Sequence, residues 1–173
     1  HQEIKRIIDK TSNDAEKTVK MTLIKPVISE VTDNAPASAG IGAREDVSEI
    51  LKNCLEKSIK AVSFLLDISK EISSSESACE FLGGSVLAEI DEQLHEKRPS
   101  SFSPGVPEAF ISNYAASMKF VEALQTKAET ISQVSAEKFF ESEALRIFYK
   151  RWNLSVYFTL RFQEIAGDVD ETL

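Results

Sequence analysis

Few residues of this chain could act as a general acid or base. The two histidines are the terminal His1 and His95, and histidine is the commonest acid–base catalyst near neutral pH. His95 lies in the polar sequence EQLHEKR, so we expect a solvated surface side chain. The acidic residues fall mainly on predicted exposed helix faces, as charged runs usually do. We find no Glu-x-x-His, EF-hand or Walker motif. The sequence therefore predicts no catalytic, cofactor or metal site and no enzyme.

The cysteines and the glycine pair could also carry chemistry, but a structural interpretation is favoured for both. Cys54 and Cys79 have no second cysteine pair to complete a zinc site, and we expect two buried free thiols rather than a disulfide. Gly83 and Gly84 interrupt a helical pattern, and no phosphate-loop lysine follows them. We expect these glycines to permit close approach of another helix rather than to bind a ligand.

A basic cluster is the one local reversal of the acidic charge balance. It consists of Arg146, Lys150, Arg151 and Arg161. We favour solvated charges, or charges paired within the chain near Glu143, Glu164 and the acidic tail. The alternative is a contact site for an acidic partner subunit or a membrane-proximal protein.

The basic cluster lies in the most aromatic segment, residues 143–167, which contains the only tryptophan. Its alternation of apolar and polar residues fits a β-strand, but no other segment could pair with it. We favour a helix with two apolar stripes on opposing sides. The residues that we expect to anchor the structure are Trp152, Leu154, Phe158 and Phe162.

Helical periodicity recurs along the rest of the chain. Apolar residues spaced three and four apart predict helices over residues 3–31, 44–72, 79–97 and 110–131. Pro26 should kink or end the first of these near Lys25. Residues 33–43 have a linker-like composition, and the Pro-rich residues 98–107 predict a connecting loop with Pro107 as the first residue of the next helix. The prediction is a single all-α domain, an elongated antiparallel helical bundle.

Charge and hydropathy exclude several classes of protein. The net charge of −8 argues against a nucleic-acid partner and against broad contact with anionic lipid. No window approaches the ~18 apolar residues of a membrane span, and no signal sequence is evident. The chain starts at His1 without an initiator methionine, so we expect a fragment of a longer protein or a processed product.

Three sequence segments carry a resemblance to a known family. They are KRWNLSVYFTLRFQEIAG, the upstream SFSPGVPEAFISNY and the intervening SMKFVEAL. Together they resemble subunit 2 of the conserved oligomeric Golgi complex, most clearly over residues 102–167. In that family a proline usually stands at the position of Ser155. This departure leaves open whether the last helix starts afresh after Asn153 or runs straight through from Phe148.

The resemblance implies a non-catalytic structural subunit with a helical-rod fold that acts in intra-Golgi retrograde transport. It implies a peripheral location on the cytosolic face of the Golgi membrane. The implied partners are other subunits of the same tethering complex, with SNAREs, Rab GTPases and coiled-coil tethers reached by the complex as a whole. Two alternatives stay open: a helical adaptor of another trafficking complex, and a helical bundle whose aromatic segment lines a small-molecule pocket.

Overall fold

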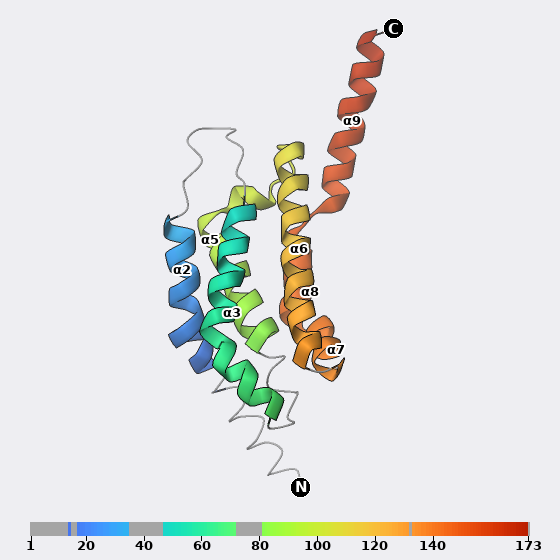
Figure 1. Cartoon of the computed structure of the whole chain (residues 1–173). Helices are drawn as coiled ribbons and strands as arrows, with labels where there is room; N and C mark the ends of the chain where they lie inside the picture. Colours follow the sequence, from blue (N-terminus) through green and yellow to red (C-terminus); the bar gives the residue numbers. More distant parts are fainter. Residues whose placement is uncertain (1–13, 15–16, 35–46, 72–80, 132, 173) are drawn as a thin grey trace.

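The structure, a computed structural model, describes residues 14, 17–34, 47–71, 81–131 and 133–172 (Figure 1). These residues form helices and contain no strand, which confirms the predicted all-α class. The elements are the π-helical η1 (Lys20–Ile24), α2 (Lys25–Asn34), α3 (Ser48–Glu71), the π-helical η2 (Phe81–Leu87), α5 (Ala88–Lys97), the 3₁₀-helical η3 (Pro99–Phe102), α6 (Pro107–Ile131), α7 (Gln133–Glu141), α8 (Glu143–Arg151) and α9 (Leu154–Thr172).

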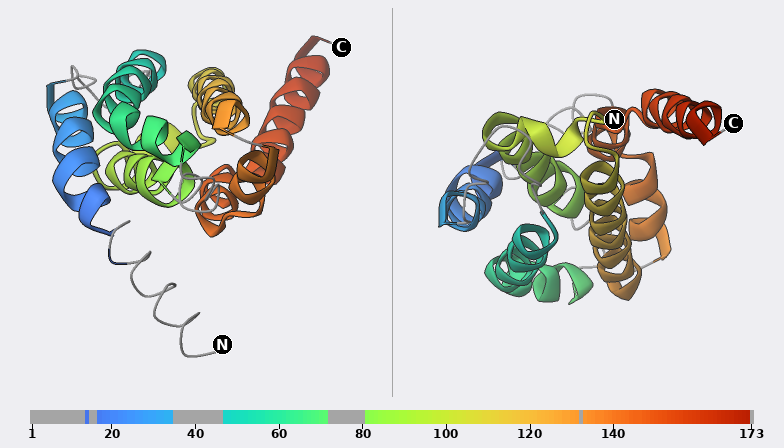
Figure 2. Two further views of the ribbon diagram at one scale, coloured as in Figure 1. Left: turned by 60° about the horizontal axis from the view of Figure 1, so that its bottom comes forward. Right: turned by 90° about the horizontal axis from the view of Figure 1, so that it is seen from above.

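The long helices form an antiparallel bundle. In Figure 1, α2, α5 and α8 run upward while α3 and α6 run downward, and α9 extends beyond the top of the body. Helix α3 packs against both α2 and α6, and α2 also packs against α5. The view from above in Figure 2 shows these helices arranged around a common centre, with α9 to one side. The predicted elongated bundle is confirmed.

One hydrophobic core holds the body together. It takes buried residues from η1, α2, α3, η2, α5, α6, α7 and α8. Leu51 on α3, Leu124 on α6 and Phe148 on α8 are among its fully buried members. Each repeats at helical spacing with other apolar residues of its own helix, which is why the sequence pattern located these helices.

The prolines act where the sequence indicates. Pro26 is the second residue of α2, directly after the π-helical η1, so the chain stays helical and changes its hydrogen-bond pattern at Lys25. Pro107 begins α6, where its missing N–H and fixed φ cost nothing. The predicted loop 98–107 is a connection that contains the short η3. Most of the predicted linker 33–43 lies outside the described residues.

Gly83 marks a close contact between two parts of the body. A Cβ atom at this position would lie 3.2 Å from the Ser142 hydroxyl oxygen and 3.3 Å from its Cβ. It would also lie 3.6 Å from the ring of Phe139. The absence of a side chain at Gly83 therefore lets η2 approach the junction of α7 and α8, as the structural interpretation of the glycine pair predicts.

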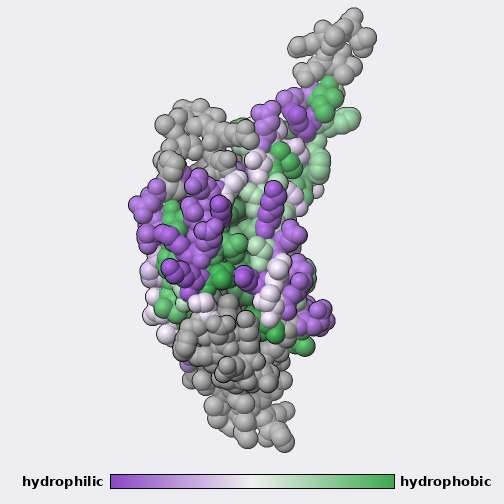
Figure 3. All heavy atoms as spheres, viewed as in Figure 1, coloured by the Kyte–Doolittle hydropathy of each residue, from purple (hydrophilic) through white to green (hydrophobic). Residues whose placement is uncertain are grey.

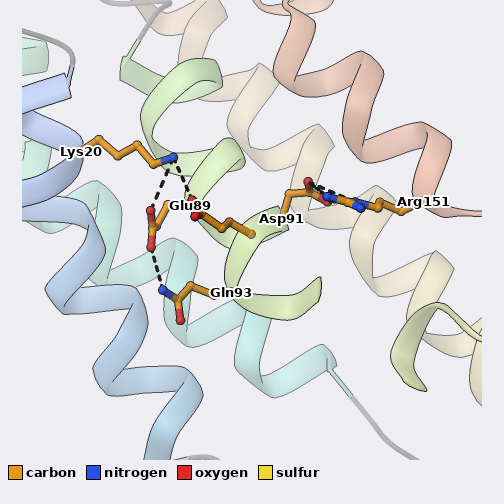
Figure 4. Close-up of polar contacts among 6 residues, drawn as sticks. Lys20, Glu89, Asp91, Gln93 and Arg151 are labelled. Carbon is orange, nitrogen blue, oxygen red and sulfur yellow. Dashed lines mark hydrogen bonds and ion pairs between the residues drawn. The ribbon is translucent and has the colours of Figure 1, made fainter. Parts of the chain in front are cut away.

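A buried carboxylate joins η1 to α5 (Figure 4). The Glu89 side chain is completely buried, and one of its oxygens accepts a hydrogen bond of 2.8 Å from the Gln93 amide. The Lys20 ammonium lies 3.6 Å from the other oxygen and 3.2 Å from Glu92. Since a buried charge is costly without a counter-charge, the Lys20 ammonium offsets part of the cost of burying the Glu89 carboxylate and links η1 to α5.

Candidate functional site

The aromatic segment begins with a well-capped helix that belongs to the body. The Ser142 hydroxyl accepts a hydrogen bond of 3.3 Å from the backbone N–H of Leu145, which is the standard serine cap of a helix start. Leu145 and Phe148 then bury one face of α8 in the core. Helix α8 is thereby fixed in position before the chain reaches Trp152.

Trp152 lies at the centre of an aromatic cluster. Its ring centroid is 4.8 Å from that of Phe102, 5.5 Å from Phe110, 5.6 Å from Tyr114 and 6.4 Å from Phe148. The residue is only 5% exposed, and its indole N–H has no hydrogen-bond partner among the described residues. Packing between tilted and edge-on rings therefore holds the indole.

The chain breaks its helix at Trp152 and starts a new one after Asn153. Trp152 has an extended backbone, with φ −89° and ψ 95°. The Asn153 side-chain oxygen accepts the N–H of Val156 at 3.1 Å, and its carbonyl accepts the N–H of Tyr157 at 3.1 Å. Asn153 is therefore the N-cap of α9. Ser155 falls in the first turn, where a proline would fit without breaking a helical hydrogen bond.

Among the described residues, the contacts of α9 with the body lie near the start of the helix. Tyr157 stacks on Phe110 with centroids 5.2 Å apart, and Leu154 packs against the cluster around Trp152. Beyond this contact the helix extends past the end of the bundle in Figure 1 and lies to one side of it in the view from above in Figure 2. No other described part of α9 packs against the core.

The projecting helix carries an exposed apolar face. Phe158, Phe162 and Ile165 are 62%, 74% and 55% exposed, and we call these three residues the α9 stripe. Their spacing of four and three places them on one side of the helix. Figure 3 shows hydrophobic atoms along this otherwise isolated helix. A face of this kind fits the packing of a further helix.

The structure divides the four residues that the sequence predicts as anchors. Trp152 and Leu154 lie in the aromatic cluster, whereas Phe158 and Phe162 are exposed and leave the body. The anchoring role stays a prediction for the first two. Phe158 and Phe162 make no described contact with the body that they could anchor. We therefore interpret them as members of the exposed α9 stripe.

The four predicted basic residues do not form a single patch. The Arg151 guanidinium spans the two oxygens of Asp91 on α5, with contacts of 3.0 Å and 3.0 Å, and so ties α8 to α5 (Figure 4). Arg146 pairs with Glu143 on α8, and Arg161 pairs with Glu164 on α9 at 2.5 Å. Lys150 is exposed and makes no ion pair with a described residue.

The pKa values follow from these pairs. Hydrogen bonds to Asp91, Glu143 and Glu164 raise the pKa of the three arginines above the usual value. The Arg146 hydrogen bond in turn lowers the pKa of the Glu143 carboxyl. Three of the four basic residues thus bind charges of their own chain, and their role toward a partner stays a prediction.

The other candidates for chemistry are separate from this region. His95 is exposed, 6.4 Å from the ring of Phe102. Burial raises the pKa of the Cys54 thiol to about 12, so the thiol stays protonated at neutral pH, and Cys79 lies outside the described residues. The part of the chain that the structure describes holds no cluster of three or more possible metal ligands and no helix long and apolar enough to cross a membrane.

Sequence reasoning missed two features of the site. The Asp91–Arg151 pair joins residues 60 positions apart, and nothing in a single sequence indicates such a pairing. A groove of about 400 Å³ lies between α3 and α6, where no residue of the aromatic segment lines it. Small residues at helical spacing on α6 are the only signal that could have located this groove.

Comparison with known proteins agrees with the resemblance. The family described as "COG complex component, COG2, C-terminal" matches residues 150–173, the end of α8 and all of α9. Conserved oligomeric Golgi complex subunit 2 of Arabidopsis thaliana is 36% identical over 171 residues, and subunit 2 of Homo sapiens is 36% identical over 172. Each match covers 96% of this chain and 22% of the relative.

The comparison has two further results. Subunit 2 of Dictyostelium discoideum is 34% identical over 86 residues, 50% of this chain and 9% of that relative. No solved structure matches the chain significantly. The chain spans about a fifth of the length of the first two relatives. Over almost its whole length, and well beyond residues 102–167, this chain is therefore similar to a part of conserved oligomeric Golgi complex subunit 2, and the resemblance seen in its sequence is confirmed.

Proposed function

We propose that this chain is a structural, non-catalytic part of a subunit of a multisubunit vesicle-tethering complex at the Golgi. The observation that carries the proposal is the similarity to conserved oligomeric Golgi complex subunit 2 over 96% of the chain. Its work is to hold other subunits in place through helix packing. The complex acts in intra-Golgi retrograde transport and in Golgi organisation.

The geometry supports assembly through α9. The body packs its helices around buried hydrophobic clusters, whereas the α9 stripe lies on a helix that leaves the body and exposes two phenylalanines and an isoleucine to solvent. Exposed aromatic side chains on a helix are typical of the centre of a protein–protein contact. The occupant that we propose for the stripe is an apolar helix face of another subunit of the same complex. This choice rests on the relatives being named as subunits of a complex.

The wider setting of the proposal follows the same similarity. The chain associates peripherally with Golgi membranes on the cytosolic face. Its direct partners are other subunits of the complex. SNAREs, Rab GTPases and coiled-coil tethers are reached by the assembled complex rather than by this chain alone.

The test is capture of partners from cytosol with the affinity-tagged protein, followed by identification of the bound proteins by mass spectrometry. The wild type should recover other subunits of the Golgi complex. The double variant Phe158→Ser/Phe162→Ser should lose them, because it removes most of the α9 stripe. A matched control is Phe140→Ser on α7, which replaces another exposed phenylalanine, 52% exposed, outside the stripe.

Each outcome of this test decides a separate point. If the wild type captures subunits of a different trafficking complex, the proposed complex is wrong and the captured one takes its place. Golgi subunits that the double variant captures as well as the wild type does would exclude the stripe as the binding surface. If the double variant and the Phe140→Ser control both lose subunit capture, the cause is destabilised protein. A urea unfolding curve of each variant detects this independently.

A further inference from the structure

A groove on the body, separate from α9, lies between two helices that run side by side. Helices α3 and α6 line it over residues 48–55 and 112–120, and its volume is about 400 Å³. At 1.5 Å per residue these segments are about 11 and 12 Å long, which corresponds to two helical turns. In Figure 3, hydrophobic atoms lie between the hydrophilic surfaces of α3 and α6. The groove therefore has the length of a short helical segment.

The floor of the groove is apolar and lets a backbone come close. Leu51 and Leu55 contribute from α3, and Phe120 from α6. The α6 side also presents Ala115 and Ala116, whose side chains are small. A floor of two leucines and a phenylalanine beside two alanines accepts apolar side chains and allows a helix to lie close to α6.

Two lysines give the groove its charge. Lys52 on α3 and Lys119 on α6 both line it, and both are exposed. Neither lysine makes an ion pair with any residue in the described ranges. On Lys20, Lys57 and Lys97, by contrast, each ammonium lies beside a carboxylate of the same chain. The groove thus has two lysines without an ion-pair partner among the described residues, on a chain whose net charge is −8.

From this combination we propose that the groove is a second docking site, whose occupant is an amphipathic protein helix of about two turns with acidic residues flanking its apolar stripe. The apolar side chains enter between α3 and α6, and the flanking carboxylates pair with Lys52 and Lys119. Charge complementarity selects this occupant, because two cations beside an apolar floor match carboxylates beside an apolar stripe. The acidic net charge opposes broad contact with an anionic membrane. The proposal does not depend on the identity of the complex or on α9.

The experiment is site-specific photo-cross-linking in the protein as it is expressed in its own cells. A diazirine amino acid replaces Ala115, an exposed residue of the groove, or Thr126, an exposed residue of α6 outside it. Irradiation and mass spectrometry then identify the cross-linked peptide. We expect position 115, and not position 126, to yield a peptide from an acidic amphipathic helix.

A charge reversal tests what holds that helix. Lys52→Glu/Lys119→Glu should lower the cross-link yield by about tenfold, because it turns two attractions into two repulsions. The matched control is Lys60→Glu/Lys127→Glu, which makes the same change at exposed positions of the same two helices outside the groove. It should leave the yield unchanged. Equal urea unfolding midpoints of the two variants exclude a folding defect as the cause.

Several results would overturn the proposal. They are a yield at position 115 no greater than at position 126, a cross-link to lipid, and a protein cross-link that survives the reversal of both lysines. The variant Phe158→Ser/Phe162→Ser should keep the cross-link at the groove. In this variant, loss of subunit capture with a retained cross-link agrees with both proposals. Retained capture would contradict the α9 proposal alone, and a lost cross-link would contradict this one alone.

Discussion

Two aromatic residues on either side of Asn153 lie in opposite environments. Before Asn153, Trp152 is 5% exposed and surrounded by four rings from η3, α6 and α8. After it, Phe162 is 74% exposed and makes no ring contact with another described aromatic residue. Ten residues of one continuous segment separate a core position from an open one. The hydrophobicity of a residue therefore indicates that its side chain must be covered. It does not indicate which part of the protein covers it.

The largest effect on stability is expected from removing the buried indole ring of Trp152. Trp152→Ala should lower the free energy of unfolding by about 3–5 kcal/mol, since it leaves a cavity where five aromatic residues meet. Urea unfolding followed by circular dichroism measures the change. A midpoint equal to that of the wild type would contradict the core position of the indole.

A smaller effect is expected from the ion pair that fixes α8. Arg151→Ala removes the cation from Asp91, whose side chain is only 8% exposed, and should cost about 1–2 kcal/mol. Arg161→Ala removes an exposed pair on α9 and should leave the free energy of unfolding almost unchanged. The same unfolding assay compares the two arginines. Equal costs would mean that the Asp91 contact contributes no more than a surface pair.

Removing the N-cap of α9 should affect α9 and not the body. Asn153→Ala removes the acceptor of the Val156 N–H and should destabilise the start of α9 by about 1 kcal/mol. Because α9 contacts the body only near that start, amide hydrogen exchange should speed up in α9 and stay unchanged in α3 and α6. Faster exchange throughout the body would show that α9 stabilises the bundle more than its described contacts indicate.

The smallest effect is expected at the α9 stripe. Phe158→Ser/Phe162→Ser should change the free energy of unfolding by less than about 0.5 kcal/mol, since both rings are exposed. Its effect should instead be on partner capture. A fall in the urea midpoint comparable to that of Trp152→Ala would place these rings in the core and remove the reason for proposing the stripe as a binding surface.

Local sequence signals predicted most of the fold. The apolar spacing of α3 and α6 located both helices, and Pro107 marked the start of α6 within one connecting loop. These features depend on neighbours within a turn or two, so a single sequence contains them. The sequence leaves the break at Trp152 open, because an asparagine in a helix cap and an asparagine within a helix look alike until the backbone shows which one is present.

The long-range features could not be predicted in this way. Arg151 was grouped with Arg146 and Arg161 by proximity in sequence, yet its partner Asp91 comes from a helix 60 residues away. Phe158 and Phe162 were grouped with Trp152 by residue type, yet they lie on the far side of a helix break. Both differences have the same cause, since packing partners depend on the path of the chain between them.

The short joint between α8 and α9 has a mechanical consequence. Only Trp152 and Asn153 separate the two helices, and α9 is 19 residues long. At 1.5 Å per residue it is a lever of about 28 Å, so a 10° rotation at the joint displaces its far end by about 5 Å. The aromatic cluster around Trp152 and the cap at Asn153 together determine the direction in which α9 leaves the body. Substitutions buried in the body can thus change where a distant partner is held without touching the surface that binds it.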